Sequence, residues 1–159
     1  MSAMDDISKR PNAVPWPPLV LTVAATLSIA LGYISPMSIP QNVAVRSVGY
    51  LSVVAGISLD VWAIITLNKA HTSVLPHRGA SRLVTHGPFG FTRNPIYLGN
   101  TMLMGGIGLA FAAGWFAIME IVSAFIVDRL AIRPEERHLA ARFGKQWIDY
   151  ASRVPRWLF

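Results

Sequence analysis

The residues best suited to chemistry lie in one short stretch, HGPFGFTRNPIYLGN, which runs from His86 to Asn100. Arg93 in this stretch offers a planar guanidinium with a rigid fork of donors. Three aromatic rings accompany it: Phe89, Phe91 and Tyr97. Pro88 and Pro95 prevent the stretch from forming one regular helix. Irregular polar backbone between apolar runs indicates a segment that lines a cavity, although a connector whose arginine binds lipid phosphate has the same composition.

A second polar segment follows the last long apolar run. It begins with Pro134, Glu135 and Glu136. Apolar residues then recur at helical spacing among basic ones: Leu139, Phe143, Trp147 and Val154. The pattern predicts an amphipathic helix over about residues 134–153, with the proline in its first turn and the acids complementing its dipole. Such a helix suits a membrane surface or the other polar segment, and we interpret Trp147 and Trp157 as interfacial anchors.

Several kinds of chemistry are excluded by residue type and spacing. The histidines at positions 71, 77 and 86 fit no compact metal-binding motif, and the chain has no cysteine. We therefore predict no metal site. No G-x-S-x-G elbow, P-loop or G-x-G-x-x-G is present. An arginine, two carboxylates and aromatic rings remain, and this set suits a zwitterionic ligand with a cationic centre.

The composition indicates a membrane protein. Of the 159 residues, 53% are hydrophobic and only 14% are charged, whereas soluble domains carry about 25% charged residues. Apolar runs predict four transmembrane helices, at about residues 16–34, 43–67, 95–113 and 115–132, the last two as a helical hairpin. Residues 1–15 form a polar lead, and residues 16–159 form a single domain. We assign the net charge of +6 to contact with anionic lipids and not to nucleic acid.

The basic residues predict the orientation of this all-α, multi-pass integral membrane protein. Four spans place both termini and the connection over residues 68–95 on one side. All of the 14 lysines and arginines except Arg46 then lie on that side or at its membrane edge. The positive-inside rule makes it the cytoplasmic side. The two polar segments are therefore expected to meet there.

The order of several short motifs resembles the isoprenylcysteine carboxyl methyltransferase family, which belongs with the membrane phospholipid N-methyltransferases. The motifs are Leu83-Val84-Thr85, Gly87-Pro88-Phe89, Arg93-Asn94-Pro95-x-Tyr97-x-Gly99 and, after the hairpin, Glu135-Glu136-x-x-Leu139-x-x-x-Phe143-Gly144. The resemblance covers roughly residues 68–157. It implies S-adenosylmethionine bound at the cytoplasmic face without a Rossmann domain, and a lipophilic acceptor that enters from the bilayer.

The resemblance also implies roles for individual residues. The cofactor would be walled by His86, Gly87, Pro88, Phe89, Arg93, Asn94, Pro95 and Tyr97. Glu135 and Glu136 would hold its amine or ribose, and Leu139 would pack near the adenosine. The catalytic residues would be Arg93, Asn94 and Glu136, with Arg93 orienting the cofactor or an acceptor carboxylate. Many members have histidine where Asn94 stands, so an imidazole base is missing there.

We therefore predict methyl transfer from S-adenosylmethionine to a lipophilic carboxylate, amine or thiol. A carboxylate acceptor needs no base, whereas an amine or thiol could lose its proton to Glu136 or His86. The expected partners are this lipid or lipophilic substrate and the membrane lipids, and the oligomeric state stays open. An alternative is a small proton-coupled transporter that uses the intramembrane acids Asp60 or Glu120. A non-enzymatic scaffold that binds anionic lipid is a third possibility.

Overall fold

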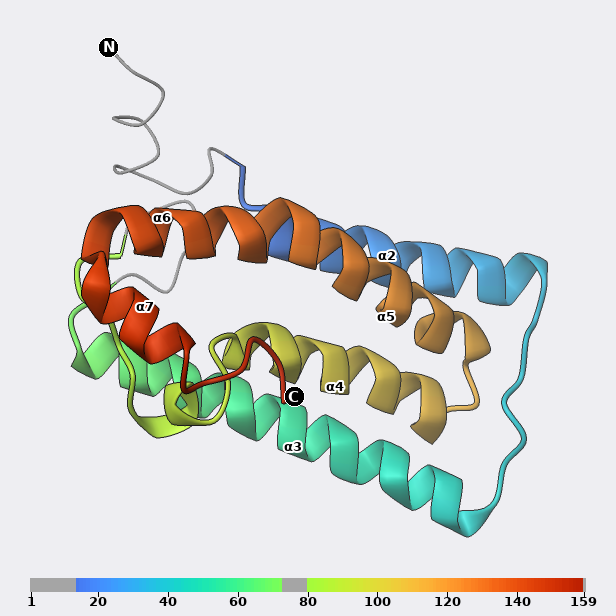
Figure 1. Cartoon of the computed structure of the whole chain (residues 1–159). Helices are drawn as coiled ribbons and strands as arrows, with labels where there is room; N and C mark the ends of the chain where they lie inside the picture. Colours follow the sequence, from blue (N-terminus) through green and yellow to red (C-terminus); the bar gives the residue numbers. More distant parts are fainter. Residues whose placement is uncertain (1–13, 73–79, 159) are drawn as a thin grey trace.

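The computed structural model describes residues 14–72 and 80–158, and its regular elements in these ranges are helices (Figure 1). Most of the predicted polar lead and His77 lie outside the described residues. The elements in chain order are α2 (Trp16–Ile34), α3 (Val43–Lys69), η1 (Gly87–Gly90), α4 (Pro95–Ala110), α5 (Gly114–Val127), η2 (Asp128–Ile132), α6 (Arg133–Phe143) and α7 (Lys145–Ala151).

Two helices, α2 and α3, are long and apolar enough to cross a membrane. The bounds of α2 equal those predicted, and α3 extends two residues beyond the predicted end at residue 67. Both helices expose large apolar side chains along their length, including Leu27 and Val54. The third and fourth predicted spans form shorter helices, because α4 has 16 residues and α5 has 14, whereas a bilayer core requires about 20.

The helices pack in pairs, with α3 along α4 and α2 along α5, and α4 and α5 join the two pairs (Figure 1). Small residues allow the backbones of α3 and α4 to approach closely. A Cβ atom at Gly56 would lie 2.6 Å from the carbonyl oxygen of Gly99, and one at Gly106 would lie 2.9 Å from that of Gly49. The side chain of Asp60 lies at the same crossing, against Gly99.

The structure differs from the prediction of a separate final helix opened by Pro134. Helical structure continues from Gly114 through α5, η2 and α6 to Phe143. Proline removes one amide and its ring crowds the carbonyl four residues earlier. The preceding π-helical turn, η2, in which the Arg133 amide donates to the Asp128 carbonyl, spreads the backbone here. The helix therefore accommodates the proline and continues.

The predicted amphipathic helix over residues 134–153 is instead divided at Gly144. This glycine has φ +51° and ψ −121°, a conformation that residues with a side chain rarely adopt. The chain turns sharply there, and α7 folds back toward the start of α4 (Figure 1). Residues 152–158, here called the C-terminal segment, continue from α7 toward the middle of the bundle (Figure 1).

Candidate active site

A cavity of about 320 Å³ lies at the end of the bundle where α4 begins. This volume is at the lower end of the range for small-molecule sites, about 300–1,000 Å³. Its walls come from the start of α2, the end of α3, the connection before α4, and α6 and α7. The polar and aromatic residues of the lining include Phe89, Arg93, Asn94, Tyr97, Glu135, Trp147 and Tyr150. The two polar segments of the sequence therefore meet at one cavity.

Arg93 extends its guanidinium between an acid and an aromatic ring. Its Nη1 atom lies 3.1 Å from Oε1 of Glu136, and its Cζ atom lies 5.7 Å from the centre of the Trp147 ring. The Nε atom of Arg93 is buried and has no hydrogen-bond partner in the described part of the chain. A buried donor without a partner is costly. Arg93 also lines the cavity, so its guanidinium is placed beside any anionic group of a ligand there.

Glu135 faces the same cavity from α6. Its Oε2 atom accepts a hydrogen bond from the Tyr97 hydroxyl, at 3.0 Å. Burial raises the pKa of Glu135 to about 7; the negative charge of Glu136 also raises it, whereas the Tyr97 hydrogen bond opposes the shift. The carboxyl group therefore changes its charge near neutral pH.

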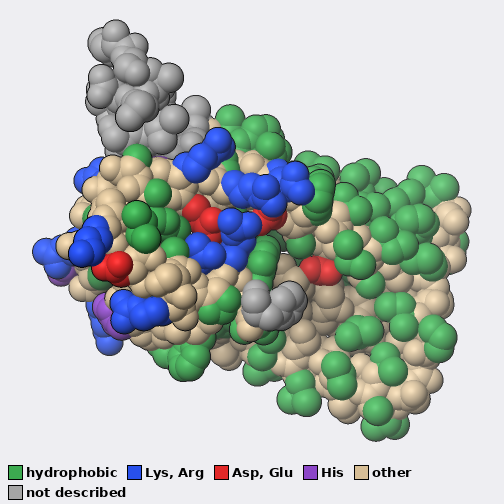
Figure 2. Space-filling model, in the orientation of Figure 1, with side chains coloured by type: hydrophobic (Ala, Val, Ile, Leu, Met, Phe, Trp, Pro, Cys, Tyr) green, Lys and Arg blue, Asp and Glu red, His purple; other side chains and the backbone are tan. Residues whose placement is uncertain are grey.

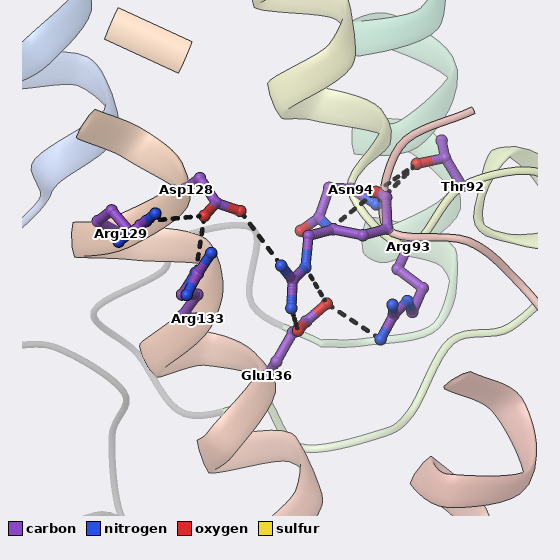
Figure 3. A network of polar contacts seen from close by, with 8 residues as sticks. Thr92, Arg93, Asn94, Asp128, Arg129, Arg133 and Glu136 are labelled. Atoms are coloured by element: carbon purple, nitrogen blue, oxygen red, sulfur yellow. Dashed lines mark hydrogen bonds and ion pairs between the residues drawn. The ribbon is translucent and has the colours of Figure 1, made fainter. Parts of the chain in front are cut away.

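Glu136 is turned away from the cavity and lies between two arginines (Figure 3). Besides its contact with Arg93, it accepts two hydrogen bonds from Arg156, at 3.1 Å from Nε and 2.5 Å from Nη2. The hydrogen bonds with Glu136 are the main reason that the pKa of Arg156 is raised. Asp128 extends this network, with Arg133 at 2.7 Å and Arg156 at 3.4 Å. Glu136 thereby holds the Nη1 end of the Arg93 guanidinium in place.

The C-terminal segment holds the Thr92–Asn94 backbone in place. The Arg93 amide donates to the Pro155 carbonyl at 2.9 Å. The carbonyl of Arg156 accepts from the Thr92 hydroxyl at 2.9 Å and from the Asn94 side-chain amide at 3.0 Å. Thr92 and Asn94 are both buried. These bonds replace the regular secondary structure that this stretch lacks.

The structure brings together most of the residues predicted to surround a cofactor. The cavity is lined by Phe89, Arg93, Asn94, Pro95, Tyr97, Glu135 and Leu139. His86, Gly87 and Pro88 are not part of its lining. His86 is exposed, and Gly87, with φ +64°, faces α3, where a Cβ atom would lie 3.2 Å from the Thr66 hydroxyl oxygen.

Three residues of the site were not predicted from the sequence: Trp147, Tyr150 and Arg156. Trp147 is 7% exposed and lines the cavity beside Tyr150, with the ring centres 5.7 Å apart. It is therefore not an interfacial anchor. The Tyr150 hydroxyl donates to the Phe89 carbonyl at 2.7 Å, and burial raises the pKa of Tyr150. The three-residue spacing of the two rings was the available signal for a shared face.

The two acids considered for a transporter lie apart from the cavity, since neither is in its lining. Asp60 lies at the crossing of α3 and α4. Glu120, on α5, packs beside Gly105 of α4. Trp157, the other expected anchor, packs against the core formed by Tyr97, Val127, Ala131 and Ile132.

Comparison with known proteins places these residues in a wider context. The sequence profile described as phospholipid methyltransferase matches residues 44–146, about two thirds of the chain. Protein-S-isoprenylcysteine O-methyltransferase B of Arabidopsis thaliana is 29% identical over 141 residues, which cover 82% of this chain and 70% of that protein. Nickel-cobalt-cadmium resistance protein NccN of Alcaligenes xylosoxydans xylosoxydans is 28% identical over 115 residues, 72% of this chain and 49% of that protein. No solved structure matches.

Proposed function

Because this chain belongs to the phospholipid methyltransferase family of membrane methyltransferases, we propose that it transfers a methyl group from S-adenosylmethionine to a lipophilic acceptor. The family uses this cofactor generally. The observation that supports the proposal best is that Arg93 and Glu135 line the same cavity. A cationic donor and an acid in the same lining match the two ends of an amino acid.

The donor set of the cavity fits the cofactor. The buried Nε of Arg93 would donate to its carboxylate, and Glu135 would accept from its ammonium or from a ribose hydroxyl. The ring faces of Trp147 and Tyr150 suit a cationic sulfonium, and Leu139 offers apolar surface for the adenosine. When bound, the cofactor supplies a methyl group activated by the positive charge on sulfur.

Two further residues are proposed to support the site around Arg93. Glu136 binds the Nη1 atom of Arg93 at 3.1 Å and is itself held by Arg156. We therefore assign Glu136 to orienting the guanidinium, in place of proton transfer. Asn94 lines the cavity, but its side-chain amide is already bonded to the Arg156 carbonyl. That bond suits a role in shaping the wall.

The acceptor is proposed to enter along the apolar part of the lining. Pro17, Pro18 and Leu21 of α2 and Ile96 of α4 contribute apolar surface to the lining. In the transfer, the bond from the methyl carbon to sulfur breaks as the bond to the nucleophile forms, and the electron pair remains on sulfur. A carboxylate acceptor is already ionised at neutral pH. The proton of an amine or thiol acceptor would pass to water, because Glu135 is assigned to the cofactor.

We further propose that α2, α3, α4 and α5 are all embedded in the bilayer, with the cavity at the cytoplasmic face. The continuous helix from α5 into η2 covers residues 114–132, which reaches the length of a span. The chain has no cysteine, so single cysteines at the exposed positions Ser38 and Ser152 allow a test in sealed cells. An impermeant maleimide should label position 38 only, and labelling of position 152 contradicts this orientation.

Calorimetric binding of S-adenosylmethionine to the detergent-purified protein tests the function. We expect a dissociation constant in about the micromolar range. Arg93→Lys keeps the charge but loses the fork of donors, so it should weaken binding by about 2 kcal/mol, roughly thirtyfold. The matched control is Arg153→Gln, which removes a cation whose Nε contacts the Asp149 carbonyl. Absence of binding in a folded, lipid-supplemented sample contradicts the proposal, as does unchanged affinity in Arg93→Lys.

A further inference from the structure

We propose that a groove on the outer side of η2 and α6 binds the phosphate of an anionic phospholipid whose acyl chains lie along α5. The groove measures about 410 Å³ and is lined by Arg129, Arg133, Glu136, Arg137, Ala140 and Arg156. It shares no lining residue with the cavity described above. Its lining does include Glu136 and Arg156, which support Arg93, so the variants below leave these two residues unchanged.

The charges of the groove leave a surplus of cationic donors. Its lining contains four arginines and one acid. The side chains of Arg129 and Arg133 are 52% and 46% exposed, whereas those of Asp128 and Glu136 are 15% and 13% exposed. The acids thus lie beneath the guanidinium groups. Figure 2 shows this arrangement, with basic side chains gathered around acidic ones.

Each guanidinium has five N–H donors, and the ion pairs of the groove occupy only some of them. Arg137 forms no ion pair in residues 14–72 and 80–158. Planar guanidinium groups bind phosphate oxygens in pairs of parallel hydrogen bonds. A phosphate in the groove would therefore meet donors that the protein's own acids leave free.

The apolar surface beside the groove indicates that the phosphate belongs to a lipid. The guanidinium of Arg129 lies 4.7 Å from the centre of the Phe125 ring, one helical turn earlier. Exposed apolar side chains continue along α5 at Ile118, Ile121 and Val122. Basic groups at the end of an apolar face match the boundary between headgroups and acyl chains. A free phosphate ion would gain nothing from this face. The inference rests on the proposed placement of α5 in the bilayer.

Native mass spectrometry of the whole chain in non-ionic detergent tests the inference. The probes are dioleoylphosphatidylglycerol and zwitterionic dioleoylphosphatidylcholine, and we expect the anionic lipid to bind more tightly. Replacing both Arg133 and Arg137 by glutamine should weaken its binding about thirtyfold. The matched control replaces Arg142 and Arg153, which lie outside the groove, and should change binding by less than about threefold because distant exposed charges are screened.

A second variant keeps the inference testable if the first variant does not fold. Ala140→Glu places a carboxylate in the groove without removing an existing ion pair, and it should also lose the preference for the anionic lipid. Equal binding of both lipids, an equal loss in the Arg142 and Arg153 control, or displacement of the lipid by inorganic phosphate would each overturn the inference. S-adenosylhomocysteine binding, measured on the same samples, is expected to persist in the groove variants. If the unaltered protein itself does not bind S-adenosylhomocysteine, the proposed function is refuted instead.

Discussion

Acidification from pH 8 to pH 6 is expected to weaken the binding of S-adenosylhomocysteine about tenfold. Burial holds the pKa of Glu135 at about 7. With that pKa, about 91% of the Glu135 carboxyl groups are ionised at pH 8 and about 9% at pH 6. If only the carboxylate pairs with the ammonium of the ligand, the affinity follows the ionised fraction, and the ratio of the two fractions is about ten.

The same pKa predicts that folding stability, unlike ligand affinity, falls as the pH rises. The unfolded carboxyl group titrates at its usual value of 4.5, and the folded one at about 7. Below pH 4.5 both states are protonated, so the raised pKa has no effect there. Between these values the folded protein binds more protons than the unfolded one, and the free energy of unfolding falls as the pH rises. The loss amounts to about 3 kcal/mol above pH 7.

Calorimetry at several pH values between 6 and 8 measures the binding, and thermal unfolding in the same detergent measures the stability. Glu135→Gln is the control, because it removes the titrating group of the protein and leaves any titration of the ligand itself. The variant should show no rise in affinity toward pH 8 and a smaller loss of stability over this range. Equal pH profiles for the variant and the unaltered protein would refute the assignment of the ammonium to Glu135.

Four further substitutions test the contacts of individual residues. Tyr97→Phe removes a hydrogen bond that lowers the pKa of Glu135, so the midpoint of the binding profile should move up by about one pH unit; an unchanged midpoint contradicts this. Gly99→Ala inserts a Cβ atom 2.8 Å from the Gly56 carbonyl oxygen and should cost about 1–3 kcal/mol of stability. Gly32→Ala, with nothing within 4 Å, should be neutral or slightly stabilising, and equal melting temperatures for these two variants would refute the packing argument. Gly144→Ala should cost about 1–3 kcal/mol through backbone strain alone, and an unaltered melting temperature would show that the turn relaxes.

The long apolar helices could be predicted from the sequence because their length alone identifies them. α2 was predicted with its observed bounds, and α3 to within two residues. The meeting of the two polar segments also followed from the alternation of spans and connections. The hydrogen bond between Tyr97 and Glu135 shows how close that meeting is. The length and order of the apolar segments were therefore enough to predict the coarse architecture.

The local turns around the site could not be predicted, because they depend on tertiary contacts. Pro134 ordinarily marks the start of a helix, and the π-helical turn that accommodates it has no clear sequence signal. Gly144 appeared only as one position of a motif, although its backbone conformation folds α7 over the cavity. The contacts of Arg156 with Glu136 and with Asn94 join residues far apart in the chain. Periodicity does not detect such contacts.

The C-terminal segment has a consequence for how the protein is made. Its carbonyl groups at Pro155 and Arg156 hold the Arg93 amide and the Asn94 side chain, and the latter pair is separated by 62 residues. During synthesis, the apolar helices are complete well before these carbonyl groups leave the ribosome. A chain that stops short of residue 155 would thus insert its helices yet lack the bonds that shape the Arg93 wall. The apolar helices and the proposed reaction site of this protein are therefore completed at different times in its synthesis.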